Sequence, residues 1–306
     1  MSETAVIVTH GDVDGMTCAA QLIRRERGEC RIVYSNATWV ARHLQRVLES
    51  HPSRVYITDI PCNERAADVA EQMTAQGAGV HWIDHHGWSG ELLDRMNRSC
   101  ARVIHNEAIN TPAGVLLGAW LKDEVPYCVR VGRICYASER GTDWERDWFR
   151  LLSSYVGRSD RAVLDRLAYE GEFTADDMRR IESQRQLEVQ AEEILAAEPR
   201  TVTTHSGKRL AVYDTSITPG LYLGGKVFRH HSVDYCLIRV AEHKWQLASN
   251  PSSGLRLDGL AGAHDLNGLQ IRVAGRPDRL LSVTTGSRGI PSDAHGRITD
   301  WAAKAL

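Results

Sequence analysis

Short apolar runs alternate with amphipathic segments over residues 4–86 of the chain. The apolar runs are rich in β-branched residues and predict strands at residues 4–9, 31–34, 54–58 and 80–83. The segments between them have the apolar spacing of helices, at residues 16–27, 39–50 and 63–76. Strands that alternate with helices indicate a parallel sheet with crossover helices, and such sheets bind ligands beyond the carboxyl ends of their strands. We therefore predict an α/β fold with its chemistry at that edge.

The second half of the chain has a different pattern. Helices are predicted at residues 111–121, 144–155 and 174–197. The last is long and polar, and a T-x-x-D capping signal at Thr174 and Asp177 begins it. Further strands are predicted at residues 209–213, 235–240, 245–249 and 269–273. We therefore expect an N-terminal domain at residues 1–172, a connector helix at 173–199 and a smaller mixed α/β domain at 200–306.

The length and composition fit this division. A chain of 306 residues has room for two domains, because single hydrophobic cores stop growing at roughly 250 to 300 residues. Its apolar fraction of 42% and charged fraction of 25% are typical of globular proteins. No apolar stretch approaches the roughly 20 residues that a membrane-spanning helix requires. A formal net charge of -2 argues against a protein that grips long duplex nucleic acid mainly through phosphate charge.

The seven cysteines are scattered along the chain and include no C-x-x-C pair. This spacing disfavours both a structural zinc site and a redox motif. Reduced thiols of this kind are typical of cytosolic proteins. The N-terminus leads directly into the first apolar run and lacks the features of a signal peptide. We therefore expect a cytoplasmic protein that does not associate with a membrane.

Three potential metal ligands follow the first predicted strand. His10, Asp12 and Asp14 alternate along the chain, so an extended backbone sends their side chains the same way. Gly15 then lets the backbone turn into the helix. A solvated acidic turn is one alternative. A calcium loop of the D-x-D-x-D-G type is another, but it is disfavoured because Gln21 stands at its twelfth position and a strand precedes it.

Two more predicted strands also end on polar residues. Asp59 follows the strand at 54–58, and alone it would fit a turn or a helix cap. Asp84, His85 and His86 follow the strand at 80–83. Adjacent imidazoles beside a carboxylate are suited to metal ions or to phosphate oxygens. Because three such strand ends occur in one predicted sheet, we expect one shared site.

The order H-x-D-x-D-G, an isolated strand-end Asp and D-H-H resembles the DHH phosphoesterase superfamily. That superfamily includes RecJ-type exonucleases, oligoribonucleases of the nano-RNase type, cyclic-dinucleotide phosphodiesterases, family II pyrophosphatases and exopolyphosphatases. The resemblance is specific over residues 5–90 and looser from there to about residue 160. It includes the stretch D-G-M-T-C-A-A, in which Cys18 stands where the family has a small Ser.

The resemblance implies two metal sites that share one carboxylate. The first would be held by His10, Asp12 and Asp59. The second would be held by Asp14, Asp59, His85 and an aspartate of a fourth motif. Carboxylate and imidazole ligands suit Mn²⁺, with Mg²⁺ as the alternative. Two such ions, roughly 3.5 to 4 Å apart, would activate water for in-line attack at phosphorus.

The resemblance also assigns the remaining residues of these motifs. Asp143, in Gly141-Thr142-Asp143, fits the neighbourhood of the fourth motif best, and Asp147 is the alternative. Asp84 would orient an imidazole, and His86 would contact the scissile phosphate. The catalytic residues implied are therefore His86 and Asp84.

The C-terminal part resembles the substrate-binding domain of many superfamily members. Residues 281–285 resemble its S-V-R-S strand, with Thr284 in place of the usual Arg. Residues 298–306 resemble the helix that leads into a G-G-G-H-x-x-A-G loop, and the 306 residues end before such a loop. Three arginines near this region are candidates for binding phosphate, namely Arg276, Arg279 and Arg288.

The implied activity is hydrolysis of phosphodiester bonds in short oligonucleotides or linear dinucleotides. The alternative is a polyphosphatase, a pyrophosphatase or a nucleoside bisphosphate phosphatase, which needs metals and arginines but no surface for bases. A nucleotide-sensing module without activity is disfavoured because every expected ligand is present. We expect short single-stranded nucleic acid, a dinucleotide or polyphosphate as the partner, and a homodimer stays open as the assembly.

Overall fold

The computed structural model describes residues 5–107, 111–122, 125–137, 141–155, 160–214, 227–228, 230–242, 244–255, 257, 259–260, 262–266, 269–276, 280–285 and 292–306. The chain forms two compact units, Met1–Gln184 and Arg185–Leu306. The division between them falls inside the helix that the sequence predicts as the connector.

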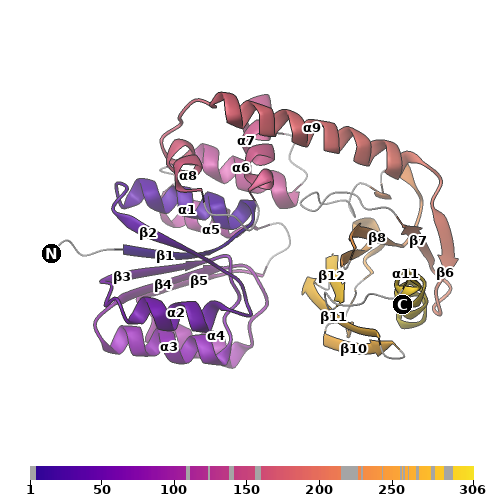
Figure 1. Ribbon diagram of the computed structural model, residues 1–306. Helices are drawn as coiled ribbons and strands as arrows, with labels where there is room; N and C mark the ends of the chain where they lie inside the picture. Colours follow the sequence, from indigo (N-terminus) through magenta and orange to yellow (C-terminus); the bar gives the residue numbers. More distant parts are fainter. Residues whose placement is uncertain are drawn as a thin grey trace. The chain divides into compact units, whose positions relative to one another are not determined.

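The first unit is built on a five-stranded parallel sheet (Figure 1). Its strands are β1 (Ala5–His10), β2 (Cys30–Ser35), β3 (Arg54–Thr58), β4 (Gly79–Asp84) and β5 (Arg102–His105). Their order across the sheet is β2-β1-β3-β4-β5, and every neighbouring pair is parallel. All carboxyl ends therefore lie at one edge of the sheet. The prediction of a parallel α/β sheet with crossover helices is confirmed.

Helices cover both faces of this sheet (Figure 1). One face carries α2 (Val40–Leu48), α3 (Glu64–Ala75) and α4 (Gly90–Ser99). The other carries α1 (Val13–Arg25), α5 (Ala113–Trp120), α6 (Pro126–Ala137), α7 (Asp143–Ser154) and α8 (Arg161–Ala168). Successive strand residues point to opposite faces. Val6 and Val8 therefore pack into the core beneath α2, α3 and α4, and Ala5 and Ile7 pack into the core on the other face, beneath α1 and α5. Burial on both faces explains why the interior strand β1 begins with four consecutive apolar residues, Ala5–Val8.

The long helix α9 (Ala175–Ala196) follows the first sheet. At its start Thr174 Oγ1 accepts a hydrogen bond from the Asp177 N–H at 3.2 Å, and Asp177 Oδ2 accepts one from the Thr174 N–H at 2.8 Å. Arg166 also donates to both oxygens of Asp177, each at 2.8 Å. The capping signal in the sequence therefore begins this helix as predicted.

The second unit contains a seven-stranded mixed sheet in the order β10-β11-β12-β9-β8-β7-β6. The strands are β6 (Arg200–Thr203), β7 (Arg209–Tyr213), β8 (Tyr235–Ala241), β9 (Lys244–Ser249), β10 (Gly262–Leu266), β11 (Leu269–Arg276) and β12 (Leu280–Thr285). A short 3-10 helix, η1 (Pro251–Ser253), follows β9. Helix α11 (Ala294–Ala305) packs Ile298 and Ala302 into the core of this unit. The prediction that the C-terminal part has a mixed α/β fold is therefore confirmed. Across the residues described, no helix is both long and apolar enough to cross a membrane.

Candidate metal centre

The turn from β1 into α1 is fixed by hydrogen bonds and by close packing. Asp12 caps α1, because its Oδ1 accepts the Gly15 N–H at 3.1 Å. Thr9 Oγ1 donates to the Gly15 carbonyl at 2.8 Å, and Thr58 Oγ1 donates to Thr9 Oγ1 at 2.8 Å. A Cβ atom at Gly15 would lie 2.3 Å from the His10 carbonyl oxygen. Only glycine therefore allows the helix to begin this close to the strand.

Asp59 lies directly after β3 in a conformation that is uncommon for its residue type. Its φ is 57°, in the left-handed region that non-glycine residues seldom occupy. The side chain is almost fully buried, and the backbone N–H donates to the Ile83 carbonyl at 2.9 Å. Strained backbone of this kind is often found where a side chain must be held for function.

The first group of potential ligands joins the ends of β1 and β3. His10, Asp12 and Asp59 each offer one ligand atom, and these atoms lie within 4.8 Å of one another. His10 Nδ1 is 2.9 Å from Asp12 Oδ2 and 3.7 Å from Asp59 Oδ2. These are the residues that the resemblance assigns to the first metal, and the structure brings them together.

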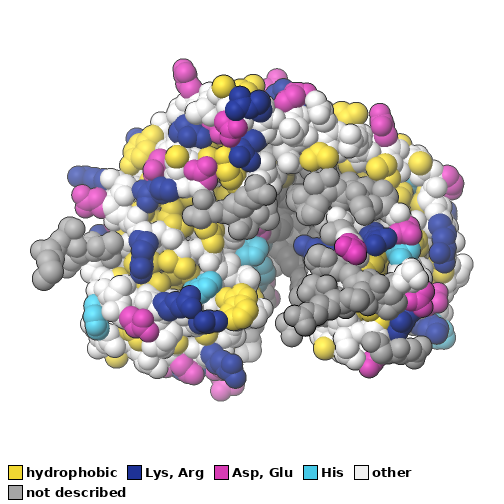
Figure 2. All heavy atoms as spheres, viewed as in Figure 1, with side chains coloured by type: hydrophobic (Ala, Val, Ile, Leu, Met, Phe, Trp, Pro, Cys, Tyr) yellow, Lys and Arg dark blue, Asp and Glu magenta, His cyan; other side chains and the backbone are white. Residues whose placement is uncertain are grey.

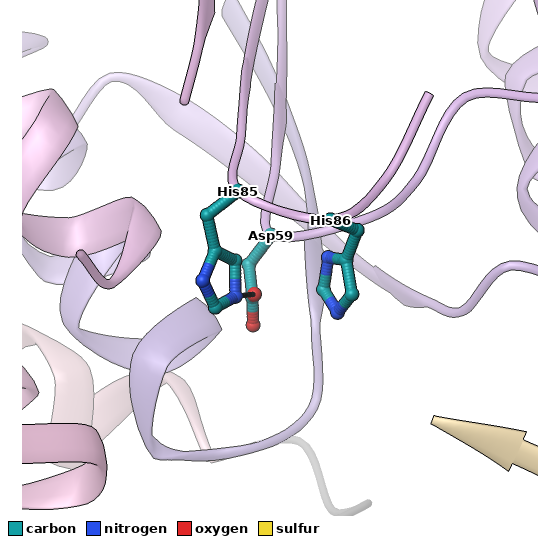
Figure 3. A group of neighbouring side chains, drawn as sticks. All are labelled: Asp59, His85 and His86. Atoms are coloured by element: carbon teal, nitrogen blue, oxygen red, sulfur yellow. Dashed lines mark ion pairs between the residues drawn. The ribbon is translucent and has the colours of Figure 1, made fainter. Parts of the chain in front are cut away.

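The second group shares Asp59 with the first. Asp59, His85 and His86 offer ligand atoms within 4.8 Å of one another. Figure 3 shows the three side chains pointing the same way from two neighbouring loops, with His85 beside the carboxylate. His85 Nε2 lies 3.2 Å from Asp59 Oδ1. Asp59 therefore presents one oxygen to each group. His86, which the resemblance assigns to phosphate, is also a member of this second group.

Asp14 lies beside the second group and is held by α5. Its two oxygens accept the N–H groups of Ala113 and Gly114, each at 2.8 Å. Its Oδ2 is 3.7 Å from His85 Nε2. A Cβ atom at Gly114 would lie 2.8 Å from Thr17 Oγ1, so glycine allows α5 to approach α1. No motif in the sequence points to these backbone donors, beyond the Pro-Ala-Gly start of the helix.

Asp84 orients the imidazole of His86. Its Oδ1 lies 2.8 Å from His86 Nδ1, and its Oδ2 accepts the His86 N–H at 3.2 Å and the Trp88 Nε1–H at 2.7 Å. Burial opposes ionisation, but the hydrogen bond from His86 holds the pKa of Asp84 below its ordinary value. An ionised Asp84 only accepts hydrogen bonds, so His86 carries its proton on Nδ1 toward Asp84.

Neither candidate for the fourth motif lies in a ligand group. The side chain of Asp143 is 90% exposed in the first turn of α7 and pairs with Arg146. Asp147 is mostly buried, and its Oδ1 lies 2.9 Å from Arg150 Nη1. Each carboxylate is thus engaged by an arginine on its own helix, three residues further along.

The arginines predicted to bind phosphate are not placed by the structure. Arg279 and Arg288 lie outside the described residues. Arg276 ends β11, and only its backbone is described. Their role in binding substrate stays a prediction.

Comparison with known proteins reveals similarity in three dimensions only. No protein-family model matches the sequence, and no curated protein matches it. A DHH-domain protein, described as a member of a family of ribosomal proteins, matches with a TM-score of 0.62 and 14% identity, over 98% of this chain and 86% of that one. RecJ from Thermus thermophilus, in complex with Mn²⁺, matches with a TM-score of 0.52 and 15% identity. The chain has the DHH fold.

The resemblance inferred from the motifs is therefore confirmed at the level of the fold. The RecJ match covers 98% of this chain but 52% of RecJ, so the chain corresponds to about half of that protein. A weaker match, with a TM-score of 0.49 and 11% identity, is an exopolyphosphatase-related protein from Bacteroides fragilis; it covers 97% of this chain and 90% of that one.

The charges around Asp59 in the first unit favour a bound cation. Burial, and then the negative charge of Asp12, raises the pKa of Asp14 to about 7. Burial raises the pKa of Asp59 well above its ordinary value, and the charges of Asp12 and Asp14 add to this effect. By contrast, His10 holds the pKa of Asp12 below its ordinary value although burial opposes this. Several carboxylates in one buried place repel one another, and a divalent cation would remove that repulsion.

The residues present fit a divalent metal ion. Both oxygens of Asp59 are buried without a hydrogen-bond donor among the described residues. A buried carboxylate of this kind is costly unless a charged partner or a metal compensates it. Carboxylate and imidazole donors suit Mn²⁺ or Mg²⁺ in the combination found at this site.

We expect the metal-free protein to lose stability as the pH rises from about 4 to about 7. An unfolded Asp releases its proton near pH 3.9, whereas folded Asp14 has a pKa of about 7. In this window the folded state binds the extra proton, so the Asp14 contribution falls by about 1.4 kcal/mol per pH unit. Asp59, whose pKa is also raised, acts in the same direction. Asp12 and Asp84, with lowered pKa values, lose their contribution only as the pH falls through and below the ordinary Asp value.

Thermal unfolding with EDTA from pH 4 to pH 8, compared with the Asp14→Asn variant, measures this dependence. The stability of the wild-type protein should fall relative to the variant as the pH rises. The stability that Mn²⁺ adds to the wild-type protein should instead grow as the pH rises, because metal ions bind deprotonated carboxylates. A metal-free wild-type protein that instead gained stability relative to Asp14→Asn as the pH rises would show that Asp14 is ionised without a metal.

Proposed function

We propose that this chain is a metal-dependent phosphoesterase of the DHH superfamily. Its proposed reaction is hydrolysis of phosphodiester bonds in short oligonucleotides or linear dinucleotides. The observation that carries the proposal is the buried Asp59 carboxylate, which presents one oxygen to each of two groups of ligands. Both groups lie at the carboxyl edge of the five-stranded parallel sheet, and folds of this kind bind their ligands at that edge.

In this proposal the residues divide into two sets of metal ligands around one bridge. His10 and Asp12 would hold one ion, His85 and Asp14 would hold the other, and Asp59 would be shared by both sets. Divalent ions bound by these residues would activate water and would neutralise charge on the phosphate. Each carboxylate is held in place before any substrate binds: Asp12 by the start of α1 and Asp14 by the start of α5.

The role proposed for His86 is to donate a hydrogen bond to the phosphate. Because Asp84 occupies Nδ1, the imidazole presents Nε2 to the site. The hydrogen bond and charge of Asp84 raise the pKa of His86 against the opposing effect of burial. A protonated Nε2 would stabilise the charge that develops on the phosphate oxygens. Asp143 would join the second metal only if its side chain turned away from Arg146, so the proposal rests on the residues that lie together.

We also propose that the protein acts in the cytoplasm. The cysteines whose side chains the structure describes are free thiols: Cys18, Cys30, Cys62, Cys100, Cys128 and Cys236. Free thiols persist where the compartment is reducing.

Hydrolysis by metal-stripped protein, with and without added Mn²⁺, tests the proposed function. The substrates are short single-stranded oligonucleotides, a linear dinucleotide, inorganic polyphosphate and pyrophosphate. We expect Mn²⁺-dependent cleavage of the nucleotide substrates, with little turnover of the inorganic ones. Turnover of inorganic chains alone would favour the phosphatase alternative, and no turnover of any substrate would reject the enzymatic proposal.

A further inference from the structure

Trp39 is a large aromatic side chain on the surface of the first unit. It is 48% exposed at the start of α2, in the loop that follows β2. It lines an open hollow of about 620 Å³ together with Arg42, Asn63 and Arg65. A second hollow, of about 230 Å³, adjoins Trp39, Arg42 and Arg46. Tryptophan is usually well buried, and a half-exposed ring beside a hollow leaves an aromatic surface available to a ligand.

This surface lies at the same edge of the sheet as the metal ligands. Strand β2 pairs with β1 so that Ser35 lies opposite His10, a proposed ligand. Asn63 fixes the Trp39 loop, because its Nδ2 donates to the Ala37 carbonyl at 3.1 Å while its Oδ1 caps α3. Neighbouring strands are about 4.8 Å apart, so the end of β2, from which the Trp39 loop leads, lies next to the proposed ligand His10.

The charged side chains around Trp39 favour an anionic ligand. Arg42, Arg46 and Arg65 are exposed, and no described carboxylate forms an ion pair with any of them. The acidic lining residue, Glu64, is already paired with Arg95 at 2.9 Å. Figure 2 shows Lys and Arg side chains beside hydrophobic ones over α2 and α3. The guanidinium of Arg42 also lies 5.7 Å from the centre of the Trp39 ring.

We propose that Trp39, Arg42, Arg46 and Arg65 bind single-stranded nucleic acid that enters the metal centre. A base stacks on the Trp39 ring, and the arginines contact the phosphates on either side. This inference rests on the proposed function and adds a binding surface for the nucleic-acid substrate beside the proposed metal ligands. An inorganic polyphosphate would use the arginines alone, because it offers no base to the ring.

Binding of a fluorescein-labelled oligothymidylate of about six nucleotides, followed by fluorescence anisotropy, tests the inference. The measurement uses the full chain with Asp59→Asn, so that binding is read without cleavage. On this background Trp39→Ala should weaken binding roughly 5- to 150-fold, and Trp39→Phe should keep most of it. Polyphosphate competition should be unchanged by Trp39→Ala. Arg42→Gln and Arg65→Gln should weaken the binding of both the oligothymidylate and polyphosphate, and should lower the salt dependence of that binding.

Matched controls are Tyr169→Ala, which removes another exposed aromatic side chain, and Arg98→Gln, an exposed arginine on α4. Both should leave binding within about twofold, since stacking and phosphate contacts lie elsewhere. Unchanged affinity of folded Trp39→Ala, or an equal loss for both ligands, would overturn the inference. So would an Asp59→Asn background that does not bind the oligonucleotide. Hydrolysis is measured separately with the wild-type chain, so binding without turnover would reject only the proposed function.

Discussion

We expect Asp59→Asn to lower metal-dependent hydrolysis by at least about a thousandfold. The change keeps the shape of the side chain but removes the charge that both ligand groups share. A thousandfold loss corresponds to about 4 kcal/mol of transition-state stabilisation, within the several kcal/mol that bound metal ions contribute to such reactions. Initial rates with saturating Mn²⁺ measure the effect.

The same variant should be at least as stable as the wild-type protein when metal is removed. Burial raises the pKa of Asp59 well above its ordinary value, so a neutral amide avoids a cost that the carboxyl group bears at neutral pH. Asp94→Asn, an exposed aspartate on α4, is the matched control and should change neither property. An Asp59→Asn protein that keeps a tenth or more of its activity would contradict the bridging role.

Gly15→Ala should destabilise the protein by about 2 to 3 kcal/mol, although alanine is the better helix former. Helix propensity alone favours alanine by about 1 kcal/mol. The new Cβ would lie 2.3 Å from the His10 carbonyl oxygen, which is backbone and cannot rotate away. Either α1 or the end of β1 must shift, and a shift moves His10 and Asp12. Activity should therefore fall together with the free energy of unfolding.

Gly90→Ala provides the comparison for that result. Gly90 begins α4, and a Cβ atom there meets nothing within 4 Å. This change should leave stability equal or up to about 1 kcal/mol higher. Denaturant unfolding of both variants measures the difference. A Gly15→Ala protein as stable and as active as Gly90→Ala would show that the turn tolerates a side chain.

The fold was predictable where the periodicity of the sequence is strong. The strands β1, β3 and β4 are apolar runs that are buried on both faces, and the helices between them have clear apolar spacing. The prediction missed β5, a four-residue strand at the edge of the sheet that is only partly buried. It also missed the helices α4, α6 and α8.

The site was predictable in part because strand ends converge in a parallel sheet. His10 ends β1, while Asp59 and His85 directly follow β3 and β4, so the order of these three adjacent strands brings the residues together. The contacts that hold Asp14 were not predictable, since its donors lie 99 and 100 residues further along the chain. The aspartate expected from the fourth motif depends on a loop-to-helix junction, and there Arg146 pairs with Asp143 instead.

The aromatic residues show the same limit of local reasoning. Trp82 and Trp88 flank the D-H-H motif, so both are candidates for stacking bases, although packing of Trp82 against the sheet is the interpretation that the sequence favours. Trp82 is fully buried and donates to the Ile60 carbonyl at 2.9 Å, while Trp88 donates to Asp84. Trp39 carries no motif, and only its exposure in the folded chain distinguishes it.

The central claim is that one buried carboxylate joins two metal sites, and counting bound Mn²⁺ tests it most directly. Metal-stripped wild-type protein and Asp59→Asn would be titrated with Mn²⁺ by calorimetry, with native mass spectrometry of the same samples. We predict two ions per wild-type chain and none held tightly by Asp59→Asn. A wild-type chain that binds a single ion, or a variant that keeps one ion at full occupancy, would contradict the claim.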